Sequence, residues 1–451
     1  MYKSALRSRG LRWASSIAAI GLTTSLLGAC SPSTDADGII HVPEEVPTLT
    51  AAEELAQPGD VIIAAPGTYN EQVEVTTPDI TIRGADRNDT IIDGEGIRPY
   101  GIVVTVDGVR VENLTVSNAT FYGLLFTGLH DESGPQAPTA SNYEPWDPEQ
   151  FPPLQRFLAD HVTASNNGLY GIYAFNSQHG AIINSYASGS ADSGIYVGQC
   201  RDCDILVQDN VAERNAVGFE NSNASDSLLV AGNRFSSNRV GLTLLSNYQE
   251  SFVPQRDNII VGNVIADNNE SDSPAQADGG FGTGIGISGG VGNLIQRNLI
   301  AGNSRSGIIL DNIEDLPSES NAFIENELTG NHLDVVNLSA ERSPASANCF
   351  DPAAGLNTHP EALADTLVSE VCTAPTSQNG DVSAAQAAAT SIPGPEAPRG
   401  VSYLSVAKPI MQPQLPPRNT YTRLSDRIVM PSADDFGLPE PSYLSERTGT
   451  L

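Results

Sequence analysis

Apolar and polar positions in the middle of the chain repeat with a period of about 23 residues. A glycine followed by a large apolar residue marks each repeat, and consecutive marks lie 23, 24, 23, 43 and 23 residues apart. The marks are Gly171–Ile172, Gly194–Ile195, Gly218–Phe219, Gly241–Leu242, Gly284–Ile285 and Gly307–Ile308. A unit of this size cannot bury its apolar face alone, so the repeat predicts a solenoid in which the units stack.

Asparagines five residues apart form a second register beside the glycines. The pairs are Asn113/Asn118, Asn210/Asn215, Asn233/Asn238, Asn263/Asn268, Asn298/Asn303 and Asn326/Asn331. The segments between these landmarks are short, apolar and rich in β-branched residues, which predicts strands and turns and not helices. Leucine-rich horseshoes and propellers do not fit, because the chain has no strict leucine pattern and propeller repeats are longer. We therefore expect an all-β fold, a single-stranded parallel β-helix.

Stacked coils place equivalent residues in columns about 4.8 Å apart. The six apolar residues that follow the glycines should form one interior column. The asparagines should form ladders at the turns, where their amides can bond the backbone and one another. This interpretation makes the asparagines structural.

Two segments carry a resemblance to a known family. Residues 58–69 and 80–84, which include Pro-Gly-Asp-Val-Ile-Ile and Ile-Thr-Ile-Arg-Gly, resemble the first coils of pectin-lyase-like right-handed β-helix proteins. Residues 192–199 resemble a largely uncharacterised bacterial subgroup of β-helix repeat proteins. The resemblance covers about residues 38–337 and implies a right-handed solenoid with a short capping helix at 51–56. It implies little chemistry, because such folds include lyases, hydrolases, epimerases and non-enzymatic proteins.

The N-terminus predicts export. Basic residues precede an apolar stretch at 14–27, which is the layout of a secretory signal peptide. The stretch is too short to be a membrane-spanning helix of the mature protein. Leu27-Gly28-Ala29-Cys30 resembles a lipobox, which implies a lipid on Cys30; an ordinary signal peptide with a chance cysteine is the alternative. We expect a signal peptide at 1–29, a tether at 30–38, the β-helix at 39–340, a C-terminal cap at 341–373, and a Pro/Ser-rich, mostly disordered tail at 374–451 with pieces that lie along the helix. Anchoring would be at an outer membrane or cell surface.

The charge and cysteine content of the chain limit which ligands and covalent links are expected. The chain holds 54 acidic and 23 basic residues, a formal charge of −31, which excludes nucleic acid as a ligand. A monomer is expected. Of five cysteines, Cys30 is assigned to the lipid, and Cys200 with Cys203 and Cys349 with Cys372 are expected to form disulfides. A redox pair or half of a metal site remains the alternative for the Cys-x-x-Cys.

Three insertions, residues 129–155, 247–256 and 270–283, border the strand that begins at each glycine. Loops gathered on one face of a rigid scaffold are the usual place for a binding site. Outward positions on this strand should form a column of Leu125, Tyr173, Tyr196, Glu220, Thr243, Gly286 and Ile309, with a second of Thr127, Phe175, Gly198, Ser222, Leu245 and Ser288. Exposed Tyr173, Tyr196 and Phe175, with Trp146 and Tyr143 from the first insertion, would suit stacking on sugar rings. Packing of these aromatics beneath the loops is the alternative.

Catalytic candidates follow only from position. Asp192 and Glu220 could act as a glycosidase pair, but a regular ladder would hold them about 13 Å apart, too far for that chemistry. Tyr173 or Tyr196 could be the base of a lyase or epimerase, with Arg239 or His179 as a cationic helper. No motif indicates a metal or cofactor; calcium is conceivable without being indicated.

Two functions remain open. The first is a membrane-anchored envelope β-helix that binds glycan or protein through the loop-lined face. The alternative is a polysaccharide lyase or epimerase acting on a uronate polymer. A third, minor interpretation is a resemblance to periplasmic β-helix proteins linked to copper loading, which the scattered six histidines and three methionines do little to support.

Overall fold

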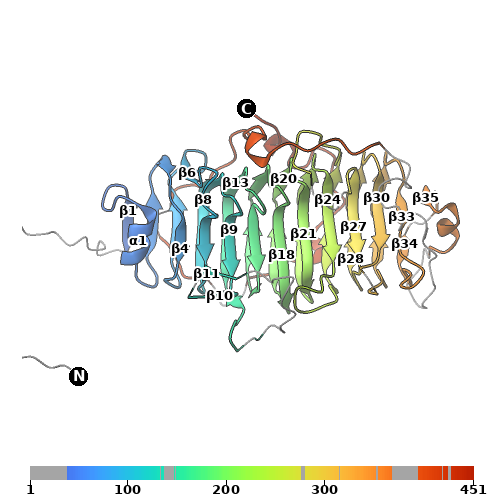
Figure 1. Ribbon diagram of the computed structural model, residues 1–451, viewed down its shortest axis with the longest axis horizontal. Coiled ribbons are helices and arrows are strands. Elements are labelled where there is room, and N and C mark those ends of the chain that lie inside the picture. The colour runs from blue at the N-terminus through green and yellow to red at the C-terminus, as the bar shows by residue number, and fades with distance from the viewer. Residues whose placement is uncertain are drawn as a thin grey trace, which may run out of the picture. The chain divides into compact units, whose positions relative to one another are not determined.

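The computed structural model describes residues 38–132, 134–136, 147, 149–275, 280–313, 315–351, 354–367, 395–418, 420–424 and 428–451. Nearly all regular structure in these residues is parallel strand, arranged as successive coils (Figure 1). Each coil carries up to three strands that pair in parallel with the equivalent strands of the coils before and after it. None of the described helices has the length and apolar character needed to cross a membrane. The predicted parallel β-helix is confirmed.

Sheet B forms one side of the solenoid, and sheet A forms the other two. Sheet B contains β4 (Val73–Val75), β7 (Tyr100–Val104), β9 (Tyr122–Thr127), β14 (Ile172–Phe175), β18 (Ser193–Arg201), β21 (Val217–Ser225), β24 (Val240–Leu245), β27 (Thr283–Ser288), β30 (Ser306–Asp311), β33 (Val335–Asn337) and β35 (Thr358–His359). The first row of sheet A contains β1 (Ile39–Val42), β2 (Val61–Ala64), β5 (Thr81–Gly84), the starts of β8 (Val109–Ser117) and β13 (Phe157–Ser165), β16 (Ala181–Ile183), β19 (Ile205–Gln208), β22 (Leu228–Ala231), β25 (Ile259–Val261), β28 (Leu294–Gln296), β31 (Ala322–Ile324) and β34 (Cys349–Asp351). Its second row contains β3 (Gly67–Tyr69), β6 (Thr90–Asp93), the ends of β8 and β13, β17 (Tyr186–Ser188), β20 (Val211–Glu213), β23 (Arg234–Ser236), β26 (Val264–Ala266), β29 (Leu299–Ala301) and β32 (Glu327–Thr329).

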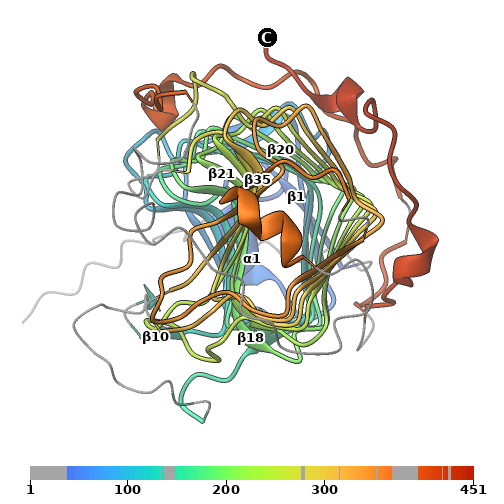
Figure 2. The same cartoon turned by 90° about the vertical axis from the view of Figure 1, so that its right-hand side faces the viewer.

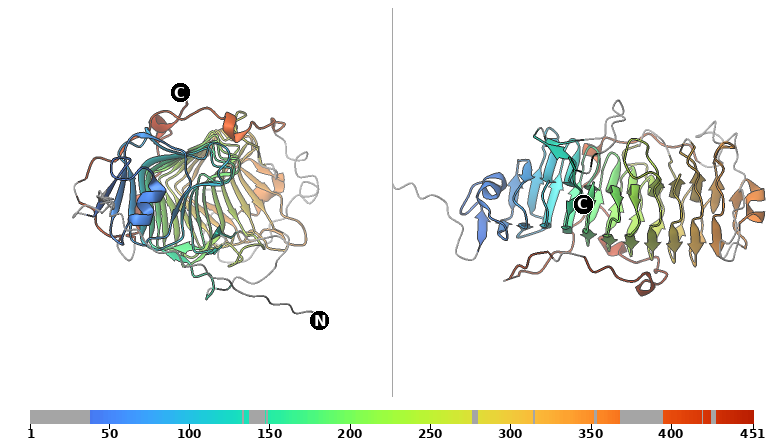
Figure 3. Two further views of the ribbon diagram at one scale, coloured as in Figure 1. Left: turned by 60° about the vertical axis from the view of Figure 1, so that its left-hand side comes forward. Right: turned by 90° about the horizontal axis from the view of Figure 1, so that it is seen from below.

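The predicted interior column is confirmed in register. Ile172, Ile195, Phe219, Leu242, Ile285 and Ile308 pair in succession, and all six are fully buried. They belong to one hydrophobic core that follows the axis of the solenoid. Helix α1 (Leu49–Leu55) closes the N-terminal end of that core with buried Leu49 and Ala52, as predicted for this segment (Figures 1 and 3). At the other end η1 (Glu361–Asp365) adds Leu363 to the core.

Asparagine ladders follow the corners between the strand rows. One ladder joins Asn210, Asn233, Asn263, Asn298 and Asn326, and a second joins Asn215, Asn238, Asn268, Asn303 and Asn331, with side-chain bonds of 2.8–3.2 Å. A third, which the sequence analysis missed, includes Asn293, Asn321 and Asn348. Asn113 and Asn118 stand outside the ladders and bond Gly84 and Asp93 instead. Burial of these amides is tolerable because each finds partners along the axis.

The repeated glycines pack directly against the second asparagine ladder. A Cβ at Gly218 would lie 2.6 Å from the Gly241 carbonyl oxygen and 2.8 Å from Asn238 Nδ2. The coil above and the ladder amide therefore occupy the place that a side chain would need. The sequence repeats a glycine at this position because the backbones approach too closely for any other residue.

Three short helical turns and extended segments make up the described part of the tail: η2 (Tyr403–Ser405), η3 (Ala433–Asp435) and η4 (Ser445–Arg447). These tail residues contact the outside of sheet A, as the sequence analysis allowed for pieces of the tail. Buried arginines and asparagines of the solenoid bond the backbone of these described tail residues. Two small pairings lie in the loops, β10 (His130–Asp131) with β11 (Gly134–Pro135), and β12 (Leu154–Gln155) with β15 (Ser177–Gln178).

Candidate functional site

The outer face of sheet B carries the predicted columns. Leu125, Tyr173, Tyr196, Glu220, Thr243, Gly286 and Ile309 pair in that order, and so do Thr127, Phe175, Gly198, Ser222, Leu245 and Ser288. The position of each candidate in the sheet was therefore predictable from the repeat. What covers each candidate was not.

The expectation that Tyr173, Phe175 and Tyr196 are exposed is wrong. They are 7%, 2% and 2% exposed, respectively, and form a cluster with Leu129 and Phe151 of the first insertion. The described end of the insertion lies over the strands, where the Asn176 side chain donates to Phe151 O and the Leu154 N–H donates to Asn176 O. The alternative, that these aromatics pack beneath the loops, is the one observed. Trp146 and Tyr143 lie outside the described residues.

A row of half-buried tyrosines borders this cluster. Tyr100, Tyr122 and Tyr170 stack on consecutive coils, with ring centroids 5.6 Å apart and interplanar angles of 20° and 6°. Phe121, beside Tyr122, is 50% exposed. We call these four residues the tyrosine strip. Sequence reasoning missed it because the tyrosines precede the strand glycine or its equivalent position, and only later positions were counted.

Glu250, from the second insertion, reaches into the cluster and was also missed. Its Oε1 accepts a hydrogen bond of 2.6 Å from the Tyr196 hydroxyl and one of 3.3 Å from Asn247. Burial raises the pKa of Glu250 to about 7, although the bond from Tyr196 opposes the shift. Asn223 holds the loop by donating to the carbonyls of Asn247 and Glu250. Loop length alone gives no signal for such a contact.

Asp192 and Glu220 lie closer together than expected. The Ser193 hydroxyl bonds Glu220 Oε2 and is 3.3 Å from Asp192 Oδ1. Because both carboxylate oxygens lie within hydrogen-bonding distance of one hydroxyl oxygen, they are within about 7 Å of each other. The estimate of about 13 Å is therefore wrong, because the side chains lean toward the serine between them instead of standing perpendicular to the strand.

The proposed cationic helpers do not converge on the tyrosines. The Arg239 guanidinium lies 5.0 Å from the centroid of the Phe281 ring and bonds the carbonyls of Ser273 and Pro398. His179 pairs with Asp204 at 3.1 Å. Arg239 precedes a strand of sheet B and His179 follows one, so they occupy opposite edges of the sheet.

Protonation also weighs against a tyrosine base. Burial raises the pKa of Tyr173 and of Tyr196 well above the usual value, and the carboxylates nearby raise it further. The pKa of Tyr122, in the half-buried strip, rises to about 12 for the same first reason. These hydroxyls stay protonated and can donate hydrogen bonds.

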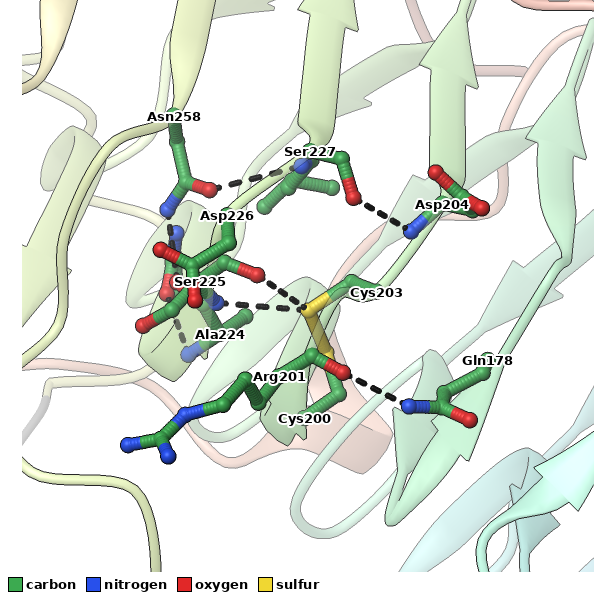
Figure 4. The surroundings of a disulfide bond; sticks show 12 residues. Gln178, Cys200, Arg201, Cys203, Asp204, Ala224, Ser225, Asp226, Ser227 and Asn258 are labelled. Atoms are coloured by element: carbon green, nitrogen blue, oxygen red, sulfur yellow. Dashed lines mark hydrogen bonds between the residues drawn. A yellow bond between two sulfur atoms is a disulfide. The ribbon is translucent and has the colours of Figure 1, made fainter.

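The cysteine pair next to this face is structural. Cys200 and Cys203 form a disulfide at the corner between β18 and β19, and the Ser225 N–H donates to Cys203 Sγ (Figure 4). Both cysteines are buried, so the redox alternative has no exposed thiol to act through. Cys349 is also disulfide-bonded; its predicted partner Cys372, like Cys30, lies outside the described residues.

Residues 59–278 match the family described as periplasmic copper-binding protein (NosD). That match falls on the stacked coils and agrees with their parallel register. The chain is a right-handed parallel β-helix repeat protein. No curated protein matches it significantly.

Solved structures similar to this β-helix protein are distant. The A-module of Azotobacter vinelandii mannuronan C-5 epimerase AlgE4 is 15% identical, covers 66% of this chain and 94% of its own, and has a TM-score of 0.39. Pectate lyase Pel9A is 15% identical, with coverages of 56% and 69% and a TM-score of 0.37. The complex of XylC with xylose is 10% identical, with coverages of 63% and 83% and a TM-score of 0.40. Likenesses this remote say nothing about the chemistry of this β-helix.

A resident copper ion does not fit the β-helix residues that the structure describes. Among them, no group of three or more His, Cys, Asp or Glu side chains is placed to hold a metal. Cys200 and Cys203 are oxidised to a disulfide, His179 pairs with Asp204, and Met411 is on the exposed tail. Soft thiolate and thioether ligands for copper are thus not gathered at one point.

Proposed function

We propose that this β-helix is an exported envelope protein, lipid-anchored through Cys30, that binds a neutral glycan chain along the tyrosine strip. The basic and apolar N-terminus and the match to a periplasmic family support export. The single observation that carries the binding site is the strip itself. It is the part of the aromatic cluster that the loops leave open.

The electrostatics favour a neutral ligand. The carboxylates of Glu220, Asp192 and Glu250 all raise the pKa of Tyr170, after the larger effect of burial. A uronate polymer would meet this negative field, and the two cationic candidates are engaged elsewhere, Arg239 with Ser273 and Pro398 and His179 with Asp204. A neutral sugar chain instead gains apolar contact with Phe121 and hydrogen bonds from a row of protonated tyrosine hydroxyls.

A second candidate function is glycoside hydrolysis, and the contact through Ser193 favours it. A carboxyl pair within about 7 Å is compatible with the separations that retaining and inverting glycosidases use. Asp192 is half-buried and Glu220 is buried, so substrate access would need the cover to move.

The test is a glycan array with the chain freed of its anchor cysteine, residues 31–451, and its Phe121→Ala variant. Phe121 is exposed, so its loss should leave the fold intact. We expect binding of a neutral polymer that weakens about tenfold in the variant, from roughly 1.4 kcal/mol of lost apolar contact. Tyr248→Ala, which removes a partly exposed tyrosine in another loop, is the control. Equal binding by all three chains, or none at all, would contradict the proposal.

Turnover separates the two candidates. New reducing ends from a bound polymer, lost in Glu220→Gln while binding persists, would establish hydrolysis. Absorbance from unsaturated uronates would instead revive the lyase. Binding with neither product fits the non-catalytic role, and incorporation of labelled palmitate that Cys30→Ser abolishes would establish the anchor.

A further inference from the structure

The described tail residues follow the outside of sheet A across many coils. Val401 bonds Ser273, and Arg423, farther along the tail, pairs with Asp79 in the early coils. Farther along the tail, Ala433 accepts a hydrogen bond from Arg297 through its carbonyl. The tail then turns back, and the N–H of its last residue, Leu451, donates to Lys408 O. Figures 2 and 3 show this red segment running along the solenoid without entering it.

Arginines of the solenoid bond the tail through its backbone. Arg83 donates to the carbonyls of Leu415 and Pro416, and fully buried Arg87 donates to Pro413. Farther along, Arg234 donates to Pro441 and Tyr443, Arg297 to Ala433 and Arg239 to Pro398. The acceptors are peptide carbonyls, so these contacts do not depend on the side chains of the tail.

Asparagines add a second set of backbone contacts. Asn166 donates to the carbonyls of Tyr403 and Val406. Asn88 both donates to Gln412 O at 3.0 Å and accepts from Gln412 N at 2.7 Å. A side-chain amide that bonds both the N–H and the carbonyl of one residue recognises an extended backbone and not a particular side chain.

The tail itself is shallowly seated. Among its described side chains, those of Val406, Gln412, Leu424 and Arg447 are buried, whereas most others are exposed. Unfilled spaces of about 420 Å³ and 480 Å³ remain between sheet A and the tail, beside Met411 and Pro417, respectively. Segments with few buried apolar contacts open more easily than a core.

An apolar stripe lies beneath part of the tail. Leu158, Leu206 and Leu229 point outward from the first row of sheet A and pack with Leu424 and Phe436 of the tail. Outward leucines on three coils would be exposed without a cover. The surface thus combines an apolar stripe with donors aimed at carbonyls.

We propose that the outer face of sheet A is a docking groove for extended, proline-rich segments of other proteins, which this chain's own tail occupies until it is displaced. Proline fits such a groove because it favours the extended polyproline II backbone and presents a carbonyl with no N–H to satisfy. Tail residues Pro398, Pro413, Pro416 and Pro441 supply carbonyls to the arginines. Recognition through the backbone lets another segment of the same character take their place.

The experiment uses the mature chain with a protease site inserted after residue 380. Cleavage leaves the tail held only by its contacts. We expect the fragment to stay bound during gel filtration and to be released by an unrelated peptide of equal length and proline content. The uncut chain should resist the same peptide, because the covalent link gives the tail a millimolar effective concentration.

Matched variants make the outcome decisive. Asn88→Ala should weaken binding of the isolated fragment to the solenoid about tenfold when the two are recombined without peptide, since two hydrogen bonds are lost. Asn357→Ala, whose side chain bonds His332 O in the last coils, should leave this affinity unchanged. A competing peptide with every proline changed to alanine should be at least about tenfold weaker. The proposal is overturned if no proline-rich peptide releases the fragment, or if the alanine peptide releases it equally well.

Discussion

The outer faces of sheets A and B are both covered, but by different means. Sheet B is covered by insertions from its own coils, and the contacts there include a buried pair of side chains that can titrate, Tyr196 with Glu250. Sheet A is covered by the remote tail, and many of the contacts there join side chains of the solenoid to the tail backbone, as in Arg87 with Pro413. A few side chains of the tail, such as Arg447 and Arg423, add contacts of their own. Contacts to the tail backbone tolerate a change of sequence, whereas the Tyr196–Glu250 pair does not.

The largest expected effect is on sheet A, at the deepest anchor of the tail. Arg447 is 5% exposed and donates to the carbonyls of Asn184, Ser185 and Asp209. Arg447→Ala removes all three contacts, although Asn184 O keeps Arg87 and Ser185 O keeps Val211 as a donor. The free energy that holds the tail on sheet A should fall by roughly 3 kcal/mol. Limited proteolysis should then cut residues 428–451 while the coils stay resistant.

Arg423→Ala is the matched control on the same tail. Its side chain is 62% exposed and its ion pair with Asp79 spans 2.8 Å. Surface pairs contribute less than about 1 kcal/mol, so proteolysis should change little. Equal cutting of both variants would mean that the tail is not held by buried anchors.

The cover of sheet B should respond to pH through Glu250. Glu250 faces Tyr170, Tyr173, Tyr196 and Glu220, and burial raises its pKa to about 7. A raised carboxyl pKa means that the folded loop binds the proton more tightly than the open loop does. Loop closure is therefore strongest below about pH 4.5, weakens as pH rises to about 7, and is constant above; the full difference is roughly 3 kcal/mol.

Hydrogen exchange of residues 246–256 between pH 4.5 and 8, corrected for intrinsic rates, measures this closure. Glu250→Gln should remove most of the dependence because the amide cannot ionise. Burial also raises the pKa of Asp311, in β30, to about 6, so stability at β30 should fall as pH rises too. The exchange of residues 246–256 themselves, and not global stability, is therefore the quantity to compare. A loop whose protection does not change with pH in the unmodified chain would contradict the assignment.

The sequence repeat predicted where each candidate residue lies in the sheet far better than whether its side chain is exposed. Columns such as Tyr173–Tyr196–Glu220 follow from the glycine spacing, because parallel pairing fixes the register of every coil at once. The exposure of a side chain depends on what the insertions and the tail cover. Their contacts join residues far apart in the chain, so no repeat in the sequence reveals them. Glu250 and Arg447 lie in such segments, so neither was found. Asp192 and Glu220 were found, but Ser193 between them set a separation that strand geometry alone could not give.

A single hydrogen bond tests the cover of sheet B more finely than the Glu250 substitution does. Tyr196→Phe removes the 2.6 Å hydrogen bond to Glu250 and nothing else from the packing of the ring. Since this bond lowers the pKa of Glu250, its loss should move the midpoint of the pH dependence upward. Loop closure should weaken by roughly 1–2 kcal/mol above that midpoint and by less below it, where the protonated acid needs the donor least. Proteolysis of the tail should be unchanged, because no side chain of the sheet B cluster takes part in the arginine and asparagine contacts that hold it. A shift in tail cutting would show that the two covers are coupled and that the faces do not act separately.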